Sequence, residues 1–154
     1  MRSLSKFHLE NPFLFENKKI GYEPAESIER VKGGNSNWRG PVWLPTNFML
    51  IDALKKMAKV ALDEIEIKYD EEKPVDINQI AKFFADSIIS IFKKNKDHIR
   101  PVWGSSFRFK DDPHWKDLLL FYEYYNPETG QGLGASHQTG WTALVANLIA
   151  DFRQ

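Results

Sequence analysis

Three stretches of this sequence repeat apolar side chains every three or four residues, which is the period of an amphipathic helix. The pattern predicts a helix over residues 46–65, a second from Ile77 to about residue 92, and a third that starts after Thr139. The buried stripes of these helices are expected to consist of Phe48, Ile51, Leu54, Ala58, Ala61 and Ile65; of Ile77, Ile80, Ala81, Phe84, Ile88 and Ile91; and of Trp141, Leu144, Val145, Leu148, Ile149 and Phe152. The chain is therefore predicted to be mainly α-helical.

Capping residues accompany the three predicted helix starts. Thr46 and Thr139 are placed as N-caps, because a threonine hydroxyl accepts a hydrogen bond from a free backbone N–H of the first turn. Asp76, followed three residues later by Gln79, forms a capping box in which each side chain bonds to the other residue's backbone. The second helix therefore has the best-marked start.

The segments between the helices are rich in turn-forming residues. Residues 1–44 read as largely irregular because glycine and proline interrupt every short apolar run, with two small strands expected on either side of residues 16–18. Residues 68–73 read as a charged, solvated linker, and Asp111–Pro113 as the opening of a short helix. The apolar and aromatic run Leu118–Tyr125 fits a helix or a strand equally well.

Composition narrows the class of protein. With 154 residues, 42% of them hydrophobic, the chain is expected to form one domain spanning residues 1–154. Its 21 Lys and Arg are balanced by 21 Asp and Glu, which argues against a nucleic-acid-binding module, since such a module needs excess positive charge. No apolar run approaches the roughly 20 residues of a membrane span, and the first residues lack the apolar core of a signal peptide.

Cysteine and histidine usage bounds the chemistry. The absence of cysteine excludes disulfides, thiol catalysis and zinc–thiolate sites, and it fits a reducing compartment, so a cytoplasmic location is expected. The four histidines have no metal-ligand spacing among them. Neither a metal nor another cofactor is therefore expected.

Three clusters combine glycine, aromatic rings and polar groups that form several hydrogen bonds. They are Gly33–Trp43, Leu120–Asn126 and Gly132–Trp141, and the first and third lie directly before a predicted helix. A sugar site needs these residue types, because apolar ring faces stack on aromatic side chains while hydroxyls need paired donors and acceptors. The residues singled out as sugar contacts are Trp38, Arg39, Trp43, His137, Gln138 and Trp141. The alternatives are a loop-fixing role for Arg39 and a capping or loop-satisfying role for His137 and Gln138.

Glu123 is the most informative single residue. It stands between Tyr122 and Tyr124 in an aromatic run, so its carboxylate is expected to be partly removed from water. A carboxylate held in this way can activate a water molecule. The alternative is an outward-pointing or ion-paired glutamate on a buried segment.

Together these clusters resemble the C-terminal part of glycoside hydrolase family 63 and its relatives, the processing α-glucosidases and mannosylglycerate-hydrolase-like proteins. The resemblance is carried by Asn37–Trp43, Phe121–Asn126 and Gly132–Val145, with Pro24–Ser27 and Asp112–Asp117 in support. It implies an (α/α)6 toroid, of which this chain would supply only the C-terminal helices, with helix ends and loops lining a sugar pocket. It also implies hydrolysis of α-glycosidic bonds with inversion.

The resemblance also implies a role for individual residues. Glu123 matches the family's general base, while Trp38, Arg39 and Trp43 match its pocket-lining motif. Trp141 matches the aromatic residue at the start of the last barrel helix. The partners implied are a carbohydrate substrate and the upstream half of the barrel.

One departure from the family pattern governs what the chain is expected to do alone. An inverting site needs two carboxyl groups about 6.5–9.5 Å apart, and the family's general acid is an upstream Asp that this sequence does not contain. The chain is therefore expected to be the C-terminal piece of a longer enzyme and to be inactive by itself. The alternatives are a non-catalytic carbohydrate-binding fragment and a helical interaction module that uses its exposed apolar stripes.

Overall fold

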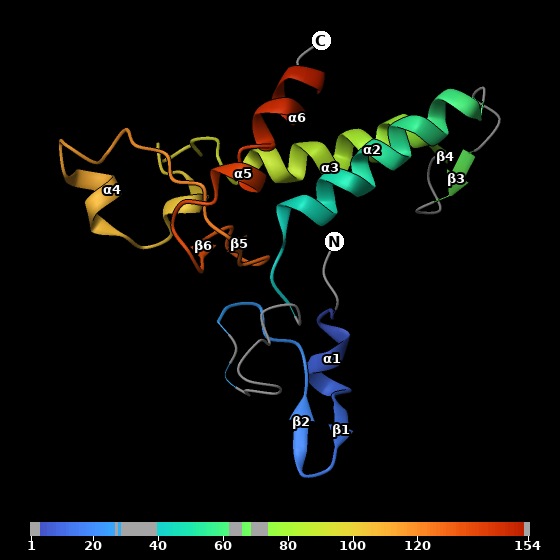
Figure 1. Cartoon of the computed structure of the whole chain (residues 1–154), viewed down its shortest axis with the longest axis horizontal. Coiled ribbons are helices and arrows are strands. Elements are labelled where there is room, and N and C mark those ends of the chain that lie inside the picture. The colour runs from blue at the N-terminus through green and yellow to red at the C-terminus, as the bar shows by residue number, and fades with distance from the viewer. Residues whose placement is uncertain (1–3, 27, 29–39, 62–65, 69–73, 153–154) are drawn as a thin grey trace.

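The computed structural model describes residues 4–26, 28, 40–61, 66–68 and 74–152, and within them the chain is mainly helical with a few short strands (Figure 1). The long helices α2 (Leu44–Val60) and α3 (Ile77–Ser90) lie side by side. The C-terminal helix α6 (Val145–Phe152) packs against α3, and the short α5 (Thr139–Thr142) contacts α2. The mainly α class predicted from the apolar periodicity is confirmed.

The core lies where these helices meet the aromatic segments that follow α3. Predicted stripe residues such as Ile51, Ile88 and Leu148 are buried there. The buried cluster also contains Leu44, Ala85, Ile89, Ile91, Phe92, Val102, Trp103, Phe109, Tyr125 and Val145. This packing places the start of α2, which follows Trp43, beside α5, which contains Trp141.

Residues 4–26 and 28 form an arm that extends away from the helical body (Figure 1). It begins with the short helix α1 (Phe7–Glu10) and continues into the hairpin of β1 (Phe13–Phe15) and β2 (Lys18–Ile20), in which Phe13 pairs with Ile20. The two small strands are confirmed, although β2 begins at a residue that was assigned to the turn. Helix α1 was not foreseen because four residues are too few to show a helical period.

Helix α3 starts as predicted, but the other two N-caps were placed wrongly. Asp76 Oδ1 accepts from Gln79 N at 2.7 Å and Gln79 Oε1 accepts from Asp76 N at 2.9 Å, so the capping box is confirmed. Helix α2 begins at Leu44, with Trp43 as its N-cap. Helix α2 begins two residues earlier than predicted because Leu44 and Pro45 form a favourable first turn. Thr46 therefore lies inside the helix, where its hydroxyl donates to the Trp43 carbonyl.

The last predicted helix is broken into two pieces. Thr139 is the first residue of α5, Gln138 is its N-cap, and α6 starts only at Val145. The residues between them form a turn in which Leu144 N donates to Trp141 O. The apolar spacing continues through this turn, which is why the pattern alone indicated one helix.

Three other segments differ from the sequence-based interpretation. The ends of the charged linker pair as an antiparallel hairpin of β3 (Glu66–Lys68) and β4 (Pro74–Asp76), while residues 69–73 lie outside the described part of the chain. A helix was expected to open at Asp111–Pro113, but the short helix α4 (Phe107–Asp111) ends there and only turns follow. Asp112 is extended, as is usual for the residue before a proline. A one-turn 3-10 helix, η1 (Pro101–Trp103), precedes α4.

The aromatic run before residue 126 is neither a helix nor a full strand. Only β5 (Tyr124–Tyr125) is extended and paired, with β6 (Gly132–Leu133). No described helix has the length and apolar character needed to cross a membrane.

Candidate carbohydrate site

Short backbone pairings bring the three sequence clusters together at one corner of the body. Val42 and Tyr125 exchange both of their backbone hydrogen bonds, at 2.8 and 2.9 Å. Tyr125 in turn pairs with Gly132, and Tyr124 with Leu133. The end of the first cluster, the second cluster and the third therefore lie side by side.

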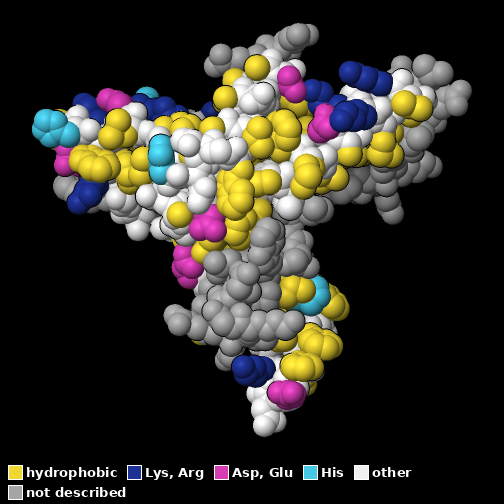
Figure 2. All heavy atoms as spheres, viewed as in Figure 1, with side chains coloured by type: hydrophobic (Ala, Val, Ile, Leu, Met, Phe, Trp, Pro, Cys, Tyr) yellow, Lys and Arg dark blue, Asp and Glu magenta, His cyan; other side chains and the backbone are white. Residues whose placement is uncertain are grey.

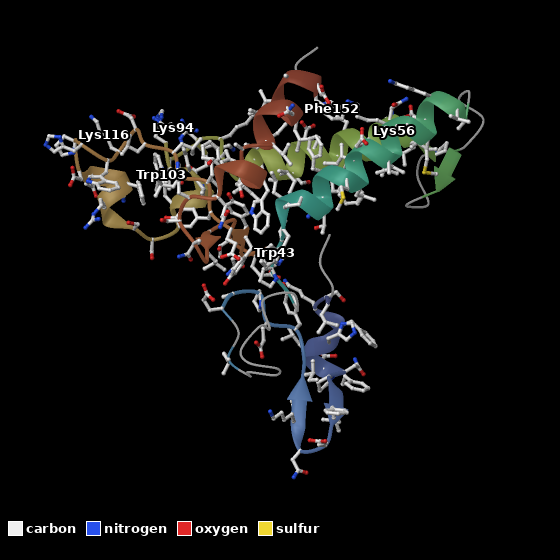
Figure 3. The ribbon with its side chains drawn as sticks, in the orientation of Figure 1. Trp43, Lys56, Lys94, Trp103, Lys116 and Phe152 are labelled. Carbon is white, nitrogen blue, oxygen red and sulfur yellow. The ribbon has the colours of Figure 1, made fainter. Side chains whose placement is uncertain are left out.

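Trp43 is fixed in this corner by the start of α2 (Figure 3). Its carbonyl oxygen accepts hydrogen bonds from Thr46 Oγ1 at 3.0 Å and from the side-chain amide of the buried Asn47 at 2.7 Å. Its ring stacks on Tyr124, with centroids 4.8 Å apart, and meets Trp141 edge-on at 5.9 Å. Three rings from three separate segments thus form a continuous aromatic wall.

Glu123 stands at the edge of this wall, half-buried. Its backbone N–H donates to Ala135 O at 2.9 Å, and its side-chain Oε2 accepts from Ala135 N at 3.1 Å. The main chain and the side chain are therefore held by the same residue. Such a double attachment gives the carboxylate one defined position.

Gly134 makes this close approach sterically possible. Its φ of 71° lies in the left-handed region that favours glycine. A Cβ atom there would lie 2.6 Å from Tyr124 Cε1 and 2.7 Å from Glu123 Oε2. Tyr124 and Glu123 thus pack directly on the bare backbone of this residue.

A second carboxylate, Glu26, reaches the same corner from the arm. Its Oε2 accepts from the Tyr124 hydroxyl at 2.7 Å, and its Oε1 accepts from Gly134 N at 3.2 Å. Burial and this hydrogen bond raise the pKa of the Tyr124 phenol, and the charge of Glu123 adds to the effect. Tyr124 therefore stays protonated at neutral pH and donates to Glu26.

Helix α5 and its N-cap form hydrogen bonds with the segment that carries Glu123. Thr142 Oγ1 donates to Tyr122 O at 2.6 Å, and Gln138 N donates to Phe121 O at 2.5 Å. The His137 ring is exposed and lies 6.0 Å from the Phe121 ring. His137 and Gln138 thus border the Glu123 segment through Phe121.

Trp141 carries an unpaired donor. Its indole N–H is buried and has no hydrogen-bond partner among the residues that the structure describes. A buried donor without a partner costs free energy, of the order of 1–3 kcal/mol. A ligand hydroxyl or a further part of the protein would relieve that cost.

Of the sequence-predicted residues, Trp43 and Trp141 contact each other, and Glu123 directly precedes Tyr124, which stacks on Trp43. Trp38 and Arg39 lie outside the described residues. Sequence reasoning missed Glu26 and Tyr124 as parts of the site, although both lie in motifs that carried the family resemblance. Nothing in the sequence indicates that Glu26 and Tyr124 form a hydrogen bond, because they lie 98 positions apart.

An open hollow of about 590 Å³ lies beside this corner. Tyr122 and Ser136, which flank Glu123 and Ala135 in the chain, form one side of it. Trp115 and Arg108 form the other, with the guanidinium 5.0 Å from the ring centroid. The hollow thus offers further aromatic and polar surface next to Glu123.

The donor set of the corner fits acid–base and hydrogen-bonding chemistry. Carboxylates, a phenol, two indoles and backbone N–H groups are present, and within the described residues no three His, Asp or Glu side chains come together as a metal site. A carboxylate beside stacked aromatic rings can bind a sugar ring and accept a proton from a hydroxyl or from water.

Comparisons with known proteins agree with this chemistry. The family model of the mannosylglycerate hydrolase MGH1-like glycoside hydrolase domain matches residues 16–142. An uncharacterized Saccharomyces cerevisiae protein is 36% identical over 159 residues, covering 98% of this chain and 15% of the relative. No solved structure is significantly similar to the chain.

Two further relatives are named for a glycosidase activity. The S. cerevisiae mannosyl-oligosaccharide glucosidase is 30% identical over 115 residues, covering 75% of this chain and 11% of the relative. A probable mannosyl-oligosaccharide glucosidase of Schizosaccharomyces pombe is 26% identical over 118 residues, covering 77% of this chain and 11% of the relative. The chain spans only a small part of each relative, and it belongs to the MGH1-like glycoside hydrolase domain family.

Proposed function

We propose that this chain is the base-bearing C-terminal part of an inverting α-glycosidase built as an (α/α)6 toroid. The observation that carries the proposal is the placement of Glu123, which Ala135 holds at the edge of the wall formed by Trp43, Tyr124 and Trp141. Glu123 is the general base of this reaction. Trp141, the partly exposed ring of the wall, contacts the apolar face of the sugar ring, with His137 and Gln138 as further contacts.

The chemistry requires two carboxyl groups with opposite tasks. The carboxylate of Glu123 takes a proton from water while the water oxygen bonds to the anomeric carbon. At the same time the bond from that carbon to the glycosidic oxygen breaks, and an upstream acid protonates the leaving oxygen. That acid belongs to the other part of the barrel in this proposal.

The names of the relatives support a proposed substrate class. Two of them are named mannosyl-oligosaccharide glucosidases and the family is named for mannosylglycerate hydrolase. We therefore place the substrate among α-glucosides of oligosaccharides and α-glycosides of small hydroxy acids. Trp38 and Arg39 are proposed to complete the pocket, the Arg39 guanidinium by donating to substrate oxygens.

The upstream part of the barrel is the proposed partner of the apolar surface of α2 and α3. Met49, Met57 and Phe83 are exposed there. Exposed apolar faces of this kind are costly on a free monomer and usually mark an interface. The matched relatives also extend far beyond the part that this chain covers.

Activity is tested on the chain and on the longest protein encoded in its reading frame. The probes are α-D-glucosyl fluoride and α-mannosylglycerate. The isolated chain should hydrolyse neither, whereas the longer protein should hydrolyse one and release the inverted anomer, as NMR of the fresh product reports. Release of the retained anomer would refute the inverting mechanism.

Substitution tests the base itself. In the longer protein, Glu123→Gln should lower kcat by about 10²–10⁴-fold, because general base catalysis is lost. Glu10→Gln, which removes an exposed carboxylate from the end of α1, serves as the control and should leave kcat unchanged. Near-normal turnover after Glu123→Gln would refute the assignment.

A second candidate function is carbohydrate binding without hydrolysis. The partly exposed ring of Trp141, whose indole N–H has no partner among the described residues, offers a sugar-binding surface that needs no second carboxylate. In this case sugars would quench tryptophan fluorescence in both proteins, Trp141→Phe would weaken the effect, and no product would form.

A further inference from the structure

The side chain of Glu26 makes two contacts with segments that lie far away in the sequence. One oxygen accepts from the Tyr124 hydroxyl and the other from Gly134 N, so the carboxylate bridges strand β5 and the turn after β6. The carboxylate reaches them from a segment 98 and 108 residues earlier in the chain. The bridge therefore joins the arm to the turn that holds Glu123.

The two glutamates accept hydrogen bonds from consecutive backbone N–H groups of one turn. Glu26 binds the N–H of Gly134, and Glu123 binds the N–H of the next residue, Ala135. The Ala135 N–H belongs to the planar peptide unit that begins at Gly134 Cα, so its position follows that of Gly134. Any movement of Gly134 away from Glu26 therefore also moves the N–H that holds Glu123.

The second contact of Glu26 acts on the aromatic wall. Tyr124 is buried between the Trp43 ring, stacked at 4.8 Å, and the bare backbone of Gly134. Its hydroxyl, donated to Glu26, sets the ring's position along the stacking plane. Glu26 thus contacts both the aromatic wall, through Tyr124, and the turn, through Gly134.

We propose that Glu26 is a positioning residue that locks the turn at Gly134 and Ala135, and through it the Glu123 carboxylate, against the aromatic wall. The inference rests on the proposed role of Glu123. Both oxygens of Glu26 accept hydrogen bonds within the protein, so the task assigned to Glu26 is to hold the turn. Its effect on turnover is exerted through Glu123.

The structural part of the inference is tested on the chain itself by ¹H–¹⁵N NMR. In Glu26→Ala the Ala135 amide should shift upfield, in the same direction as in Glu123→Ala, because its bond to the carboxylate loosens. Tyr124→Phe removes one of the two Glu26 contacts without touching the backbone and should give a smaller shift. Glu10→Gln should leave the Ala135 amide unmoved, and an unmoved Ala135 amide in Glu26→Ala would overturn the inference.

The kinetic part uses the longest protein encoded in the reading frame and the probe that it hydrolyses. Glu26→Ala should lower kcat by about 10- to 100-fold, the effect of a misplaced catalytic group, with KM within about threefold. Glu26→Gln should restore most of kcat, since its Nε2 can donate to Tyr124 Oη while its Oε1 accepts from Gly134 N.

Each kinetic outcome decides a different point. A raised KM with an unchanged kcat in Glu26→Ala would make Glu26 a binding residue and overturn the inference. Glu26→Gln as inactive as Glu26→Ala would show that the charge itself is needed, which would also overturn it. An active Glu123→Gln measured in the same series would instead reject the proposed base.

Discussion

At the scale of single residues, the site depends on one glycine that cannot carry a side chain. Gly134→Ala is expected to lower the free energy of unfolding by about 1–3 kcal/mol, because alanine is strained at a φ of 71° and its Cβ would meet Tyr124 and Glu123. Urea denaturation followed by circular dichroism measures the change.

Gly140→Ala is the matched control. A Cβ at Gly140 would meet nothing within 4 Å, and the residue lies in α5. Alanine should therefore leave stability unchanged or raise it by up to about 1 kcal/mol. Equal losses in the two variants would contradict the packing described around Gly134.

The tyrosines of the site give a prediction for alkaline pH. Burial raises the pKa of the Tyr122, Tyr124 and Tyr125 phenols above the ordinary value of about 10. Glu26 and Glu123 raise the pKa of Tyr124 further. A phenol with a higher pKa in the folded state stabilises the fold below the unfolded value. That contribution is lost as the pH rises above about 10. Stability measured from pH 8 to 12 should therefore fall at the alkaline end.

One substitution separates the two most shifted phenols. Glu26→Gln should lower the pKa of Tyr124, because it removes the hydrogen-bonded charge, and should leave that of Tyr125 unchanged, since Glu26 is not among its causes. Ultraviolet titration of Glu26→Gln with Tyr125→Phe as reference measures both. An unchanged Tyr124 titration would contradict the Glu26 bridge.

Residue types in the motifs predicted the neighbourhood of these side chains better than how they are held. Trp43 and Trp141 contact each other as expected, and Glu123 directly precedes Tyr124, which stacks on Trp43, while the roles of these residues stay predictions. The sequence does not reveal that Ala135 holds Glu123 or that Glu26 crosses to Gly134, because a backbone N–H donor exists at nearly every position. Such contacts are decided by the fold and not by residue type.

At the scale of elements, helix α3 has the strongest local signal and gives the simplest stability test. Asp76→Ala should cost about 1 kcal/mol, since it removes one half of the capping box. Asp86→Ala, which breaks only an exposed pair with Lys82 on the same helix, should cost about 0.3–0.5 kcal/mol. Chemical denaturation measures both, and equal effects would contradict the cap.

Helices with long apolar stripes were predictable, whereas their exact limits were not. Helix α2 starts earlier than its threonine indicated because Leu44 and Pro45 suit a first turn. The break between α5 and α6 leaves the apolar spacing unchanged, so periodicity alone gives no sign of it. The β3–β4 hairpin was missed because its strands, as short as those of the β1–β2 hairpin, carry charged residues where β1 is wholly apolar.

At the scale of the whole molecule, the arm exposes apolar side chains that the body does not cover (Figure 2). Phe13 is 63% exposed and Leu14 is 71% exposed, and Phe7, Leu9 and Phe15 are exposed with them. Such a patch favours association. The isolated chain should therefore form concentration-dependent oligomers, which sedimentation velocity detects.

Two substitutions on the hairpin test the source of that association. Phe13→Ser with Leu14→Ser should shift the distribution toward monomer, because apolar area is removed from the exposed strand. Lys19→Ser, which changes the residue paired with Leu14 on β2, should not shift it in that direction. A chain that stays monomeric without any substitution would contradict the expectation.

The bridge made by Glu26 also has a consequence for the order of assembly. Its partners Tyr124 and Gly134 are synthesised 98 and 108 residues after it, so the arm leaves the ribosome long before the turn exists. Contacts of such long sequence separation form late, because closing the intervening loop is entropically unfavourable. The corner formed by Glu26, Tyr124 and Gly134 should thus mature late in a nascent chain, and translation halted before Tyr124 leaves Glu26 without either partner.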